Sequence, residues 1–396
     1  MIHRIKIENF SSIAHAQDIS LLVPKNVSDM PNFKTCTYND DIRLPVSVGF
    51  FGANASGKST VLRAISNTIL FMLRSFGDPQ NNIHFQPYRQ KSWWKKPTKI
   101  LIEFDAELKG ICKTTKFQYE LHISHTDKFD DKRILYEALS CSPEGRMKKL
   151  FERKEQKFSF SKELGITGNK DPRKESIRNN ASVISTLAAF NHTQSIALVS
   201  FFSEVQTNII GTSKIPHAKE AWLSTYYKNP KCLEELNTEL QRLDLGLESM
   251  ILQQGDKGLF AKFQHFGLDE HIFLEEESNG TQRFIEIFPQ IYYALEQGSI
   301  VLIDEIDTDI HPLLLPEILR WFNSEERNTK NSQLIFTAHN PALLDELEKE
   351  QVFFSEKKTG QPTSIYSAKQ IQGLRRHPSL MKKYLSGELG AIPHIG

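Results

Sequence analysis

The chain has 396 residues, of which 39% are hydrophobic and 24% charged, as is typical of a soluble globular protein with one large or two ordinary domains. The formal net charge of +1 excludes a global basic field for nucleic acid and leaves only local patches. Apolar runs stay short of the roughly eighteen residues of a membrane span, and the N-terminus lacks a signal-peptide block, so we expect no membrane partner and a cytoplasmic location. The four cysteines lie far apart, without the paired spacing of zinc ligands.

The first predicted elements surround a glycine-rich turn. Residues 2–13, "IHRIKIENFSSI", open with the apolar–polar alternation of a strand. Residues 44–51, "LPVSVGFF", are apolar and β-prone, as a buried parallel strand should be. Apolar residues at helical spacing follow over 61–69. Between the second strand and this helix, residues 52–59 spell G-x-x-x-x-G-K-S.

In this strand–turn–helix context, the motif predicts a phosphate-binding loop rather than a chance glycine-rich turn. Gly52 and Gly57 allow unusual dihedrals, which turn backbone N–H groups toward phosphates. Lys58 would reach the β- and γ-phosphates, and the hydroxyl of Ser59 would ligate Mg²⁺. The predicted ATP-binding residues are Gly52, Asn54, Ala55, Ser56, Gly57, Lys58, Ser59 and Thr60.

The middle of the chain changes character twice. Two alternating stretches, "TKILIEFDAEL" and "KFQYELHIS", predict a β hairpin joined near Gly110. Residues 146–182 are polar and charged, and 183–250 carry apolar residues at three- and four-residue steps, which predicts helices. Residues 88–99, "YRQKSWWKKPTK", mix basic and aromatic residues. We favour a solvated loop whose tryptophans pack on protein over a nucleic-acid patch here.

Two short strands in the last third end in polar residues. Residues 300–303 are fully apolar and are followed by Asp304 and Glu305. Asp304 would hold Mg²⁺ or its bound water, and Glu305 would polarise the attacking water. Residues 333–340, "QLIFTAHN", predict a second buried strand, after which His339 would sense the γ-phosphate rather than serve as a surface or capping histidine.

An amphipathic helix precedes the first of these strands. Its apolar residues recur from Phe284 to Leu295, and the turn formed by Ser278, Asn279, Gly280 and Thr281 comes before it. Read by itself, this turn is an N-cap at a helix start.

Together these segments resemble the ABC-type ATPases of the OLD-like and RloA-like group, which are relatives of SMC proteins. "FGANASGKSTVLRAI" resembles their Walker A motif and "ESNGTQRF" their signature. "VLIDEIDTDIHPLL" resembles Walker B with its D-loop, and "LIFTAHNPALLD" the switch-histidine strand. "KKYLSGELGAIP", 382–393, resembles the tail of members that serve as ATPase subunits of bacterial anti-phage systems.

The resemblance implies an α/β P-loop NTPase of the ABC-ATPase head type. Such a head has a mixed central sheet, an antiparallel β subdomain and an inserted helical subdomain. We expect an N-terminal ATPase lobe over 1–145, a mainly helical insertion over 146–270, and a C-terminal ATPase lobe over 271–396.

The resemblance also implies cofactors and partners. ATP and Mg²⁺ would bind between two copies in a homodimer or larger oligomer. There Ser278, Asn279, Gly280 and Thr281 would bind the γ-phosphate held by the partner, and Glu305 and His339 would be catalytic in slow ATP hydrolysis. Infection sensing, or gating of a separately encoded effector such as a nuclease or toxin, would be the biological role. The alternatives are an ATPase that acts directly on DNA in repair, and a nucleotide-locked scaffold with negligible turnover.

Three departures from the pattern matter. Asn279 stands where transporters have glycine. No clear glutamine loop is present, and Gln86 is our first candidate for this metal-linking residue, with Gln90 second. His311 takes the place of the D-loop aspartate, so Asp307 or Asp309 would contact the opposing site.

Overall fold

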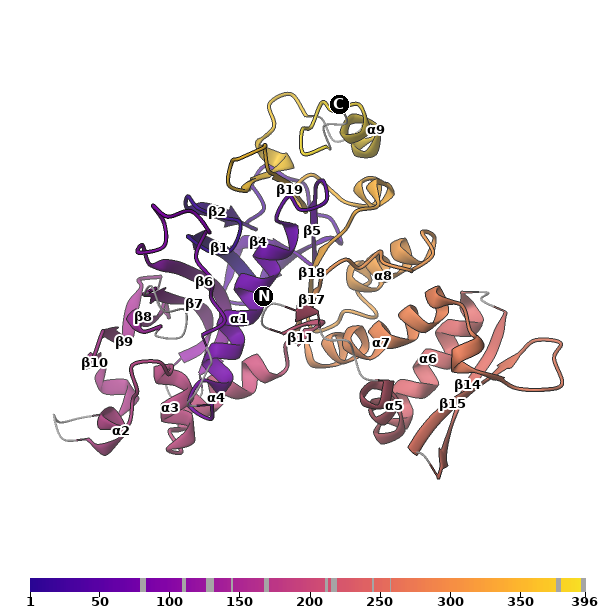
Figure 1. The fold of residues 1–396 in the computed structure, drawn as a ribbon, viewed down its shortest axis with the longest axis horizontal. Helices are drawn as coiled ribbons and strands as arrows, with labels where there is room; N and C mark the ends of the chain where they lie inside the picture. Colours follow the sequence, from indigo (N-terminus) through magenta and orange to yellow (C-terminus); the bar gives the residue numbers. More distant parts are fainter. Residues whose placement is uncertain are drawn as a thin grey trace.

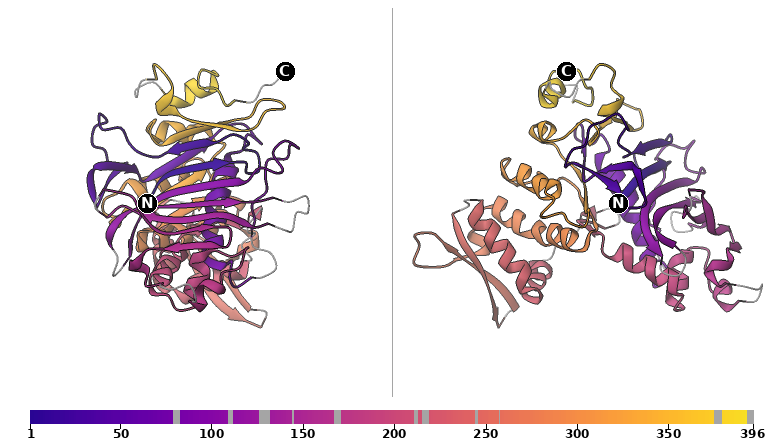
Figure 2. Two further views of the ribbon diagram at one scale, coloured as in Figure 1. Left: turned by 90° about the vertical axis from the view of Figure 1, so that its left-hand side faces the viewer. Right: turned by 180° about the vertical axis from the view of Figure 1, so that it is seen from behind.

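The computed structural model describes residues 1–78, 83–108, 112–125, 132–143, 145–166, 171–210, 213–214, 219–243, 246–256, 258–374 and 379–392. Two large sheets face each other across one helix (Figure 1). This helix, α1 (Lys58–Arg74), contacts strands of both sheets, and Figure 2 shows it from two further sides. Twelve of its residues are buried, five of them polar or charged, because the helix contacts both sheets.

The first sheet is mixed and holds six strands in the order β11-β17-β18-β5-β19-β20. The bounds of these strands are Gln206–Thr207 for β11, Ile300–Ile303 for β17, Gln333–Thr337 for β18, Ser47–Phe51 for β5, Val352–Glu356 for β19 and Ser364–Ser367 for β20. All neighbours pair in parallel except β19 and β20. Strands β5, β17 and β18 are buried along their whole length, which explains their continuous apolar sequences. The predicted mixed central sheet is confirmed.

The second sheet is antiparallel and holds seven strands in the order β10-β9-β8-β7-β6-β1-β2. The bounds are Lys157–Phe160 for β10, Lys148–Lys154 for β9, Ile134–Cys141 for β8, Cys112–Ile123 for β7, Thr98–Leu108 for β6, Ile2–Glu8 for β1 and Gln17–Ser20 for β2. The predicted hairpin is β6–β7, in register from Thr98 opposite Ile123 to Leu108 opposite Cys112. The turn expected near Gly110 lies outside the described residues.

The sequence analysis expected the helical insertion to begin at residue 146, but the structure differs there. Residues 148–160 instead continue the antiparallel sheet as β9 and β10. Leu150 and Phe151 are buried there, whereas lysines at both ends of β9 face solvent. Because lysines flank the buried residues of β9, its sequence does not show the alternation typical of a strand. Helices α3 (Val183–Ala189) and α4 (Thr193–Ser203) also belong to this lobe, since both pack against α1.

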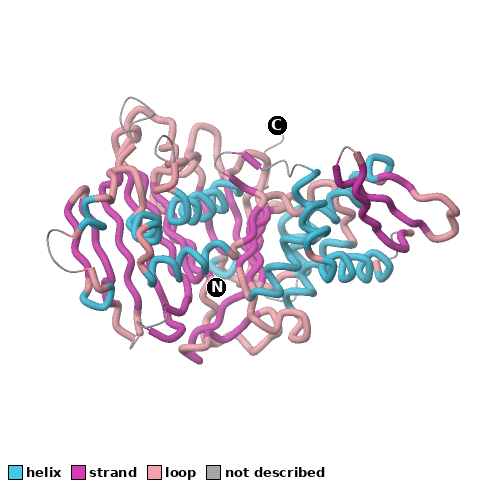
Figure 3. The backbone as a smooth tube through the Cα atoms, turned by 90° about the horizontal axis from the view of Figure 1, so that it is seen from below, coloured by secondary structure: helices cyan, strands magenta, loops and turns pink. Residues whose placement is uncertain are grey.

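One part of the chain projects from the head (Figure 3), and its buried residues belong to one hydrophobic cluster with residues of the central sheet. The projecting part contains α5 (Lys219–Lys228) and α6 (Pro230–Arg242), which both pack against α7 (Asn279–Gln297). The hydroxyl of Tyr226 in α5 donates a hydrogen bond to the carbonyl of Ile285 in α7 at 2.7 Å. A three-stranded antiparallel sheet covers these helices, with β14 at Leu247–Gly255, β15 at Gly258–His265 and β16 at Ile272–Phe273. The insertion is therefore mixed rather than mainly helical.

The remaining elements connect or flank these layers. Their bounds are Phe33–Cys36 for β3, Asn39–Pro45 for β4, Pro172–Glu175 for α2, Ile209–Ile210 for β12, Ser213–Lys214 for β13, Leu314–Asn323 for α8 and Leu380–Leu385 for α9. Short 3₁₀ turns lie at Lys162–Leu164 (η1), Leu274–Glu276 (η2), Pro341–Glu346 (η3) and Ala368–Gln370 (η4). Within the described part of the chain, no helix combines the length and apolar character needed to cross a lipid bilayer.

Candidate nucleotide-binding site

The glycine-rich turn joins β5 to α1 as the motif requires. Gly52 has φ of 147° and Gly57 has φ of 104°, a region that favours glycine. A Cβ atom on Gly52 would lie 2.2 Å from the carbonyl oxygen of Ser355, and one on Gly57 would lie 2.4 Å from Oγ1 of Thr363. Both positions therefore exclude side chains sterically as well as conformationally.

Residues far along the chain hold this loop from behind. The carbonyl of Ser56 accepts hydrogen bonds from Oγ of Ser355 at 2.9 Å and Oγ1 of Thr363 at 2.8 Å. The N–H of Ala53 donates to the carbonyl of Ala391 at 2.9 Å. The C-terminal segment, noted in the sequence only for its family resemblance, thus contacts the loop directly.

A pocket of about 600 Å³ opens over the loop. Its lining residues are Ser12, Asn54, Ala55, Gly57, Lys58, Ser59, Thr60, Arg63, Glu305 and His339. The structure thus brings the predicted loop residues together with the predicted catalytic pair, while Gly52 and Ser56 shape the loop without lining the pocket. Ser12 and Arg63 were not predicted. Oγ of Ser12 lies 2.9 Å from Oγ1 of Thr60, and Nε of Arg63 is buried without a hydrogen-bond partner in the described structure.

Lys58 lies at the bottom of this pocket with its ammonium group turned onto the loop. Its Nζ donates to the carbonyls of Gly52 at 2.8 Å and Ala53 at 3.0 Å, and lies 3.4 Å from Nδ1 of His339. Burial lowers the pKa of Lys58, although Glu305 and other nearby carboxylates oppose this shift. A buried cation supported by neutral carbonyls is well placed to bind an anionic phosphate.

Asp304 offers one unused carboxylate oxygen beside the loop. Its Oδ1 accepts hydrogen bonds from Oγ of Ser59 and Oγ1 of Thr337, both at 2.7 Å. Its Oδ2 is buried and has no partner among the described residues. A buried carboxylate oxygen without a partner is costly, and hydroxyl and carboxylate oxygens are ligands that Mg²⁺ accepts. Ser59 and Asp304 therefore fit the predicted magnesium site.

Asn208 fixes the backbone of Asp304 from the neighbouring edge strand. The N–H of Asp304 donates to Oδ1 of Asn208 at 2.8 Å, and Nδ2 of Asn208 donates back to the carbonyl of Asp304 at 3.0 Å. Asn208 directly follows β11, which pairs in parallel with β17. Because the two residues are 96 positions apart, no local sequence signal pointed to this positioning residue.

We expect Asn208→Ala to lower the free energy of unfolding by about 2 kcal/mol, since it leaves buried polar groups of Asp304 unpaired. ATP turnover should fall about tenfold, because a displaced carboxylate costs transition-state contacts. Asn328→Ala is a matched control: Asn328 is equally buried and bonds backbone groups of Phe322 and Ser332, outside the pocket. Urea unfolding should give similar losses for both variants, and equal turnover in both would contradict the positioning role.

Glu305 and His339 both line the pocket and lie next to each other. Glu305 has φ of 52°, a strained conformation for this residue, and its N–H donates to Oγ1 of Thr337 at 2.7 Å. One carboxylate oxygen lies 3.9 Å from Nε2 of His339. Asp307 accepts hydrogen bonds from the N–H groups of His339 at 2.7 Å and Asn340 at 2.5 Å. Asp307 thus positions the histidine of its own chain. Of the two aspartates considered for contact with the nucleotide site of a second copy, Asp309 is therefore the better candidate.

The signature turn caps α7, as its sequence indicates. Oγ of Ser278 accepts a hydrogen bond from the N–H of Thr281 at 3.1 Å. Gly280 packs so closely on the D-loop that a Cβ atom there would lie 2.7 Å from the carbonyl oxygen of Asp309. Ser278 and Asn279 are exposed, and none of residues 278–281 belongs to the pocket lining found in the described chain.

Neither glutamine candidate lines the pocket. The carbonyl of Gln86 accepts a hydrogen bond from the N–H of Ser11 at 2.7 Å, next to the pocket residue Ser12. Its side chain does not line the pocket, and Gln90 is exposed. The metal-linking role of Gln86 stays a prediction.

The basic and aromatic stretch at 88–99 is mostly exposed, but Trp93 packs on protein. Trp93 is 8% exposed, with His15 against its ring edge at 5.1 Å and Nζ of Lys96 3.8 Å above its ring. Nδ2 of Asn9 donates to the carbonyls of Trp93 and Lys96. The ring of Trp93 is therefore unavailable for stacking on a nucleic-acid base, whereas Trp94 is 41% exposed, so the expected packing on protein holds for Trp93 alone.

The phosphate loop, the two carboxylates and His339 all lie within residues 47–345. This stretch matches the family described as "AAA domain, putative AbiEii toxin, Type IV TA system". Among solved structures, the SMC head domain from Thermotoga maritima aligns with 92% of this chain and 98% of its own, at 12% identity and a TM-score of 0.43. No curated protein matches the chain.

Proposed function

This chain belongs to the AAA domain family matched by residues 47–345, and from that premise we propose that it binds and hydrolyses ATP between two copies paired head to tail. Each nucleotide would lie between the phosphate loop of one copy and residues 278–281 of the other. The observation that supports this pairing is the separation, within one chain, of an exposed signature turn from the pocket. A closed site then requires the second copy.

The residues of the pocket suggest how the reaction proceeds. The loop N–H groups and Lys58 would bind the phosphates. Ser59 and Asp304 would hold Mg²⁺, which would neutralise phosphate charge. Glu305 accepts the proton of the attacking water. Its carboxylate lies 3.9 Å from Nε2 of His339, so both groups can contact the same water. Hydrolysis releases the contact between the γ-phosphate and the signature of the other copy, so the pair separates.

The Ser278→Arg variant tests this pairing. Placed at an exposed turn, the arginine should leave the fold and one-site ATP binding unchanged, because Ser278 lies outside the pocket of its own chain. Turnover should fall at least 100-fold, because the bulky side chain keeps the partner from closing on the γ-phosphate. The matched control is Ser203→Arg, because Ser203 is also exposed. Ser299 would not serve, since its hydroxyl is buried. Normal hydrolysis by Ser278→Arg would contradict the paired site.

The biological role we propose is control of a separately encoded effector, such as a nuclease or toxin, in bacterial antiviral defence. Two features support it: the C-terminal segment that resembles defence-associated ATPases, and its contact with the phosphate loop through Ala391. Through that contact, a change in the phosphate loop between its ATP-bound and ADP-bound forms would alter the position of the C-terminal segment around α9. Co-purification of the chain with the product of a neighbouring gene, dependent on ATP, tests this role. Tight, steeply salt-dependent DNA binding by the isolated chain would instead favour the DNA-repair alternative.

A further inference from the structure

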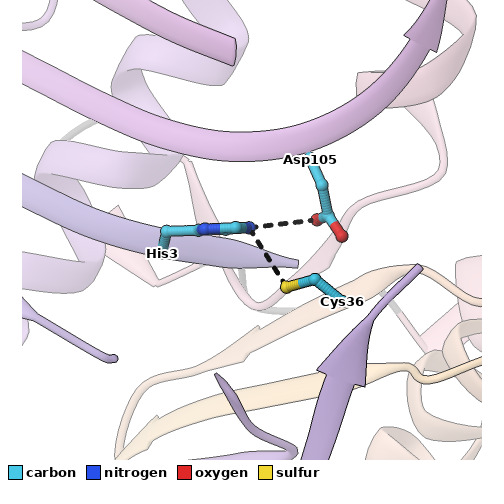
Figure 4. A group of neighbouring side chains, drawn as sticks. All are labelled: His3, Cys36 and Asp105. Atoms are coloured by element: carbon cyan, nitrogen blue, oxygen red, sulfur yellow. Dashed lines mark hydrogen bonds and ion pairs between the residues drawn. The ribbon is translucent and has the colours of Figure 1, made fainter. Parts of the chain in front are cut away.

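Three side chains with different metal-binding atoms meet where β1, β3 and β6 come together (Figure 4). Nε2 of His3 lies 4.0 Å from Sγ of Cys36 and 3.7 Å from Oδ1 of Asp105. One ligand atom from each residue lies within 4.8 Å of the other two. His3 and Cys36 are buried, and the side chain of Asp105 is 14% exposed. The cluster is therefore mostly buried, but solvent still contacts Asp105.

These separations are close to those in a zinc site. Tetrahedral Zn²⁺ with bonds of about 2.0–2.3 Å places neighbouring ligand atoms about 3.3–3.6 Å apart. The two separations from Nε2 of His3 exceed these values by a few tenths of an ångström, and Sγ of Cys36 lies within 4.8 Å of the carboxylate of Asp105, so side-chain rotations would have to close the site around an ion. Sulfur, imidazole nitrogen and carboxylate oxygen are all ligands that Zn²⁺ accepts, whereas Mg²⁺ prefers oxygen alone.

The surroundings of His3 also suit a ligand. Its second ring nitrogen, Nδ1, lies 3.4 Å from the hydroxyl of Tyr38, and the two rings stack at 6.1 Å between centroids. Metal-bound histidines commonly use the second nitrogen in this way, which fixes the ring orientation.

The α-ammonium group of Met1 is the competing partner of Asp105, with which it forms an ion pair at Oδ1. This pair satisfies the carboxylate but leaves Cys36 and His3 with a long thiol–imidazole contact. Met1 and His3 approach the same oxygen, Oδ1, so an ion bound at Oδ1 displaces the ammonium group of Met1, whereas an ion bound at Oδ2 leaves it in place.

We propose that His3, Cys36 and Asp105 form a binding site for a thiolate-preferring divalent cation of the Zn²⁺ type. Water completes the coordination. On binding, the thiol of Cys36 gives its proton to solvent and its sulfur becomes a ligand, with no electron transferred. The ion ties the β3–β4 hairpin to β1 and β6, just before β5 and the phosphate loop. The site is separate from the nucleotide pocket and does not depend on the proposed function.

The test is titration of the chelator-treated, dialysed full chain, without added residues before Met1, with Co²⁺ in excess Mg²⁺ and no nucleotide. We expect one equivalent to bind with thiolate-to-cobalt charge-transfer absorption, which Zn²⁺ then abolishes. Cys36→Ser should lose this absorption, and His3→Gln should weaken Co²⁺ binding at least tenfold. Cys232→Ser, which removes a buried thiol of the projecting part, should behave like the wild type.

A second measurement avoids variants that fail to fold. Zn²⁺ should slow modification of Cys36 by a thiol reagent in the wild-type chain severalfold, measured by peptide mass analysis, and should leave Cys232 unaffected. Absence of charge-transfer absorption in the wild type, its persistence in Cys36→Ser, or equal labelling of Cys36 with and without Zn²⁺ would each overturn the proposal. In those cases the ion pair of Met1 with Asp105 would be the whole function of the cluster.

Discussion

Glu305→Gln is expected to lower ATP turnover by about 10²- to 10⁴-fold, the usual contribution of a general base. Glutamine has nearly the same shape but cannot accept the proton of the attacking water. The φ of 52° at this position and the hydrogen bond from its N–H to Thr337 do not depend on the side chain, so the local fold should persist. ATP affinity should stay within a few-fold of the wild type.

The same variant should accumulate as an ATP-dependent dimer, because the step that separates the two copies is blocked. Light scattering with and without ATP measures this directly. Glu325→Gln is the matched control, since Glu325 is largely exposed in an ion pair with Lys34 and lies outside the pocket. If wild-type turnover is near background and Glu305→Gln does not change it, the chain is a nucleotide-locked scaffold instead.

Lys58→Ala is expected to weaken ATP binding by about 100-fold, or ~3 kcal/mol, the loss of charged hydrogen bonds to phosphate. Part of the effect would come through the loop itself, since Nζ also bonds the carbonyls of Gly52 and Ala53. Isothermal titration calorimetry with a non-hydrolysable ATP analogue gives the affinity. Lys95→Ala, at an exposed position, provides the control. Wild-type affinity in Lys58→Ala would show that ATP does not bind at this loop.

The features that the sequence predicted well are local. The phosphate loop, the strand before Asp304 and the strand before His339 each combine a continuous apolar run with a motif at its end. Such runs are buried on both faces of a parallel sheet, so their pattern does not depend on partners elsewhere in the chain. The helix start at Ser278 is equally local, since its cap uses Thr281 three residues later.

The features that the sequence did not reveal depend on contacts between distant residues. Ser355 and Thr363 hold the phosphate loop from 299 and 307 positions away, and neither belongs to a motif. Strand β9 has five charged residues out of seven, and this composition predicted a polar insertion although Leu150, Phe151 and Arg153 are buried in the sheet. His3, Cys36 and Asp105 have no shared spacing, because three strands of the fold bring them together.

The central claim, a site shared between two copies, is tested most directly by mixing two inactive variants. Lys58→Ala lacks a working phosphate loop but keeps its signature turn, and Ser278→Arg has the opposite defect. A mixed pair therefore regains one complete site, and an equimolar mixture should recover roughly one quarter of wild-type ATP turnover if pairing is random and the two sites act independently. Turnover that stays at the level of the separate variants, or a Ser278→Arg chain that hydrolyses ATP fully by itself, would contradict the account.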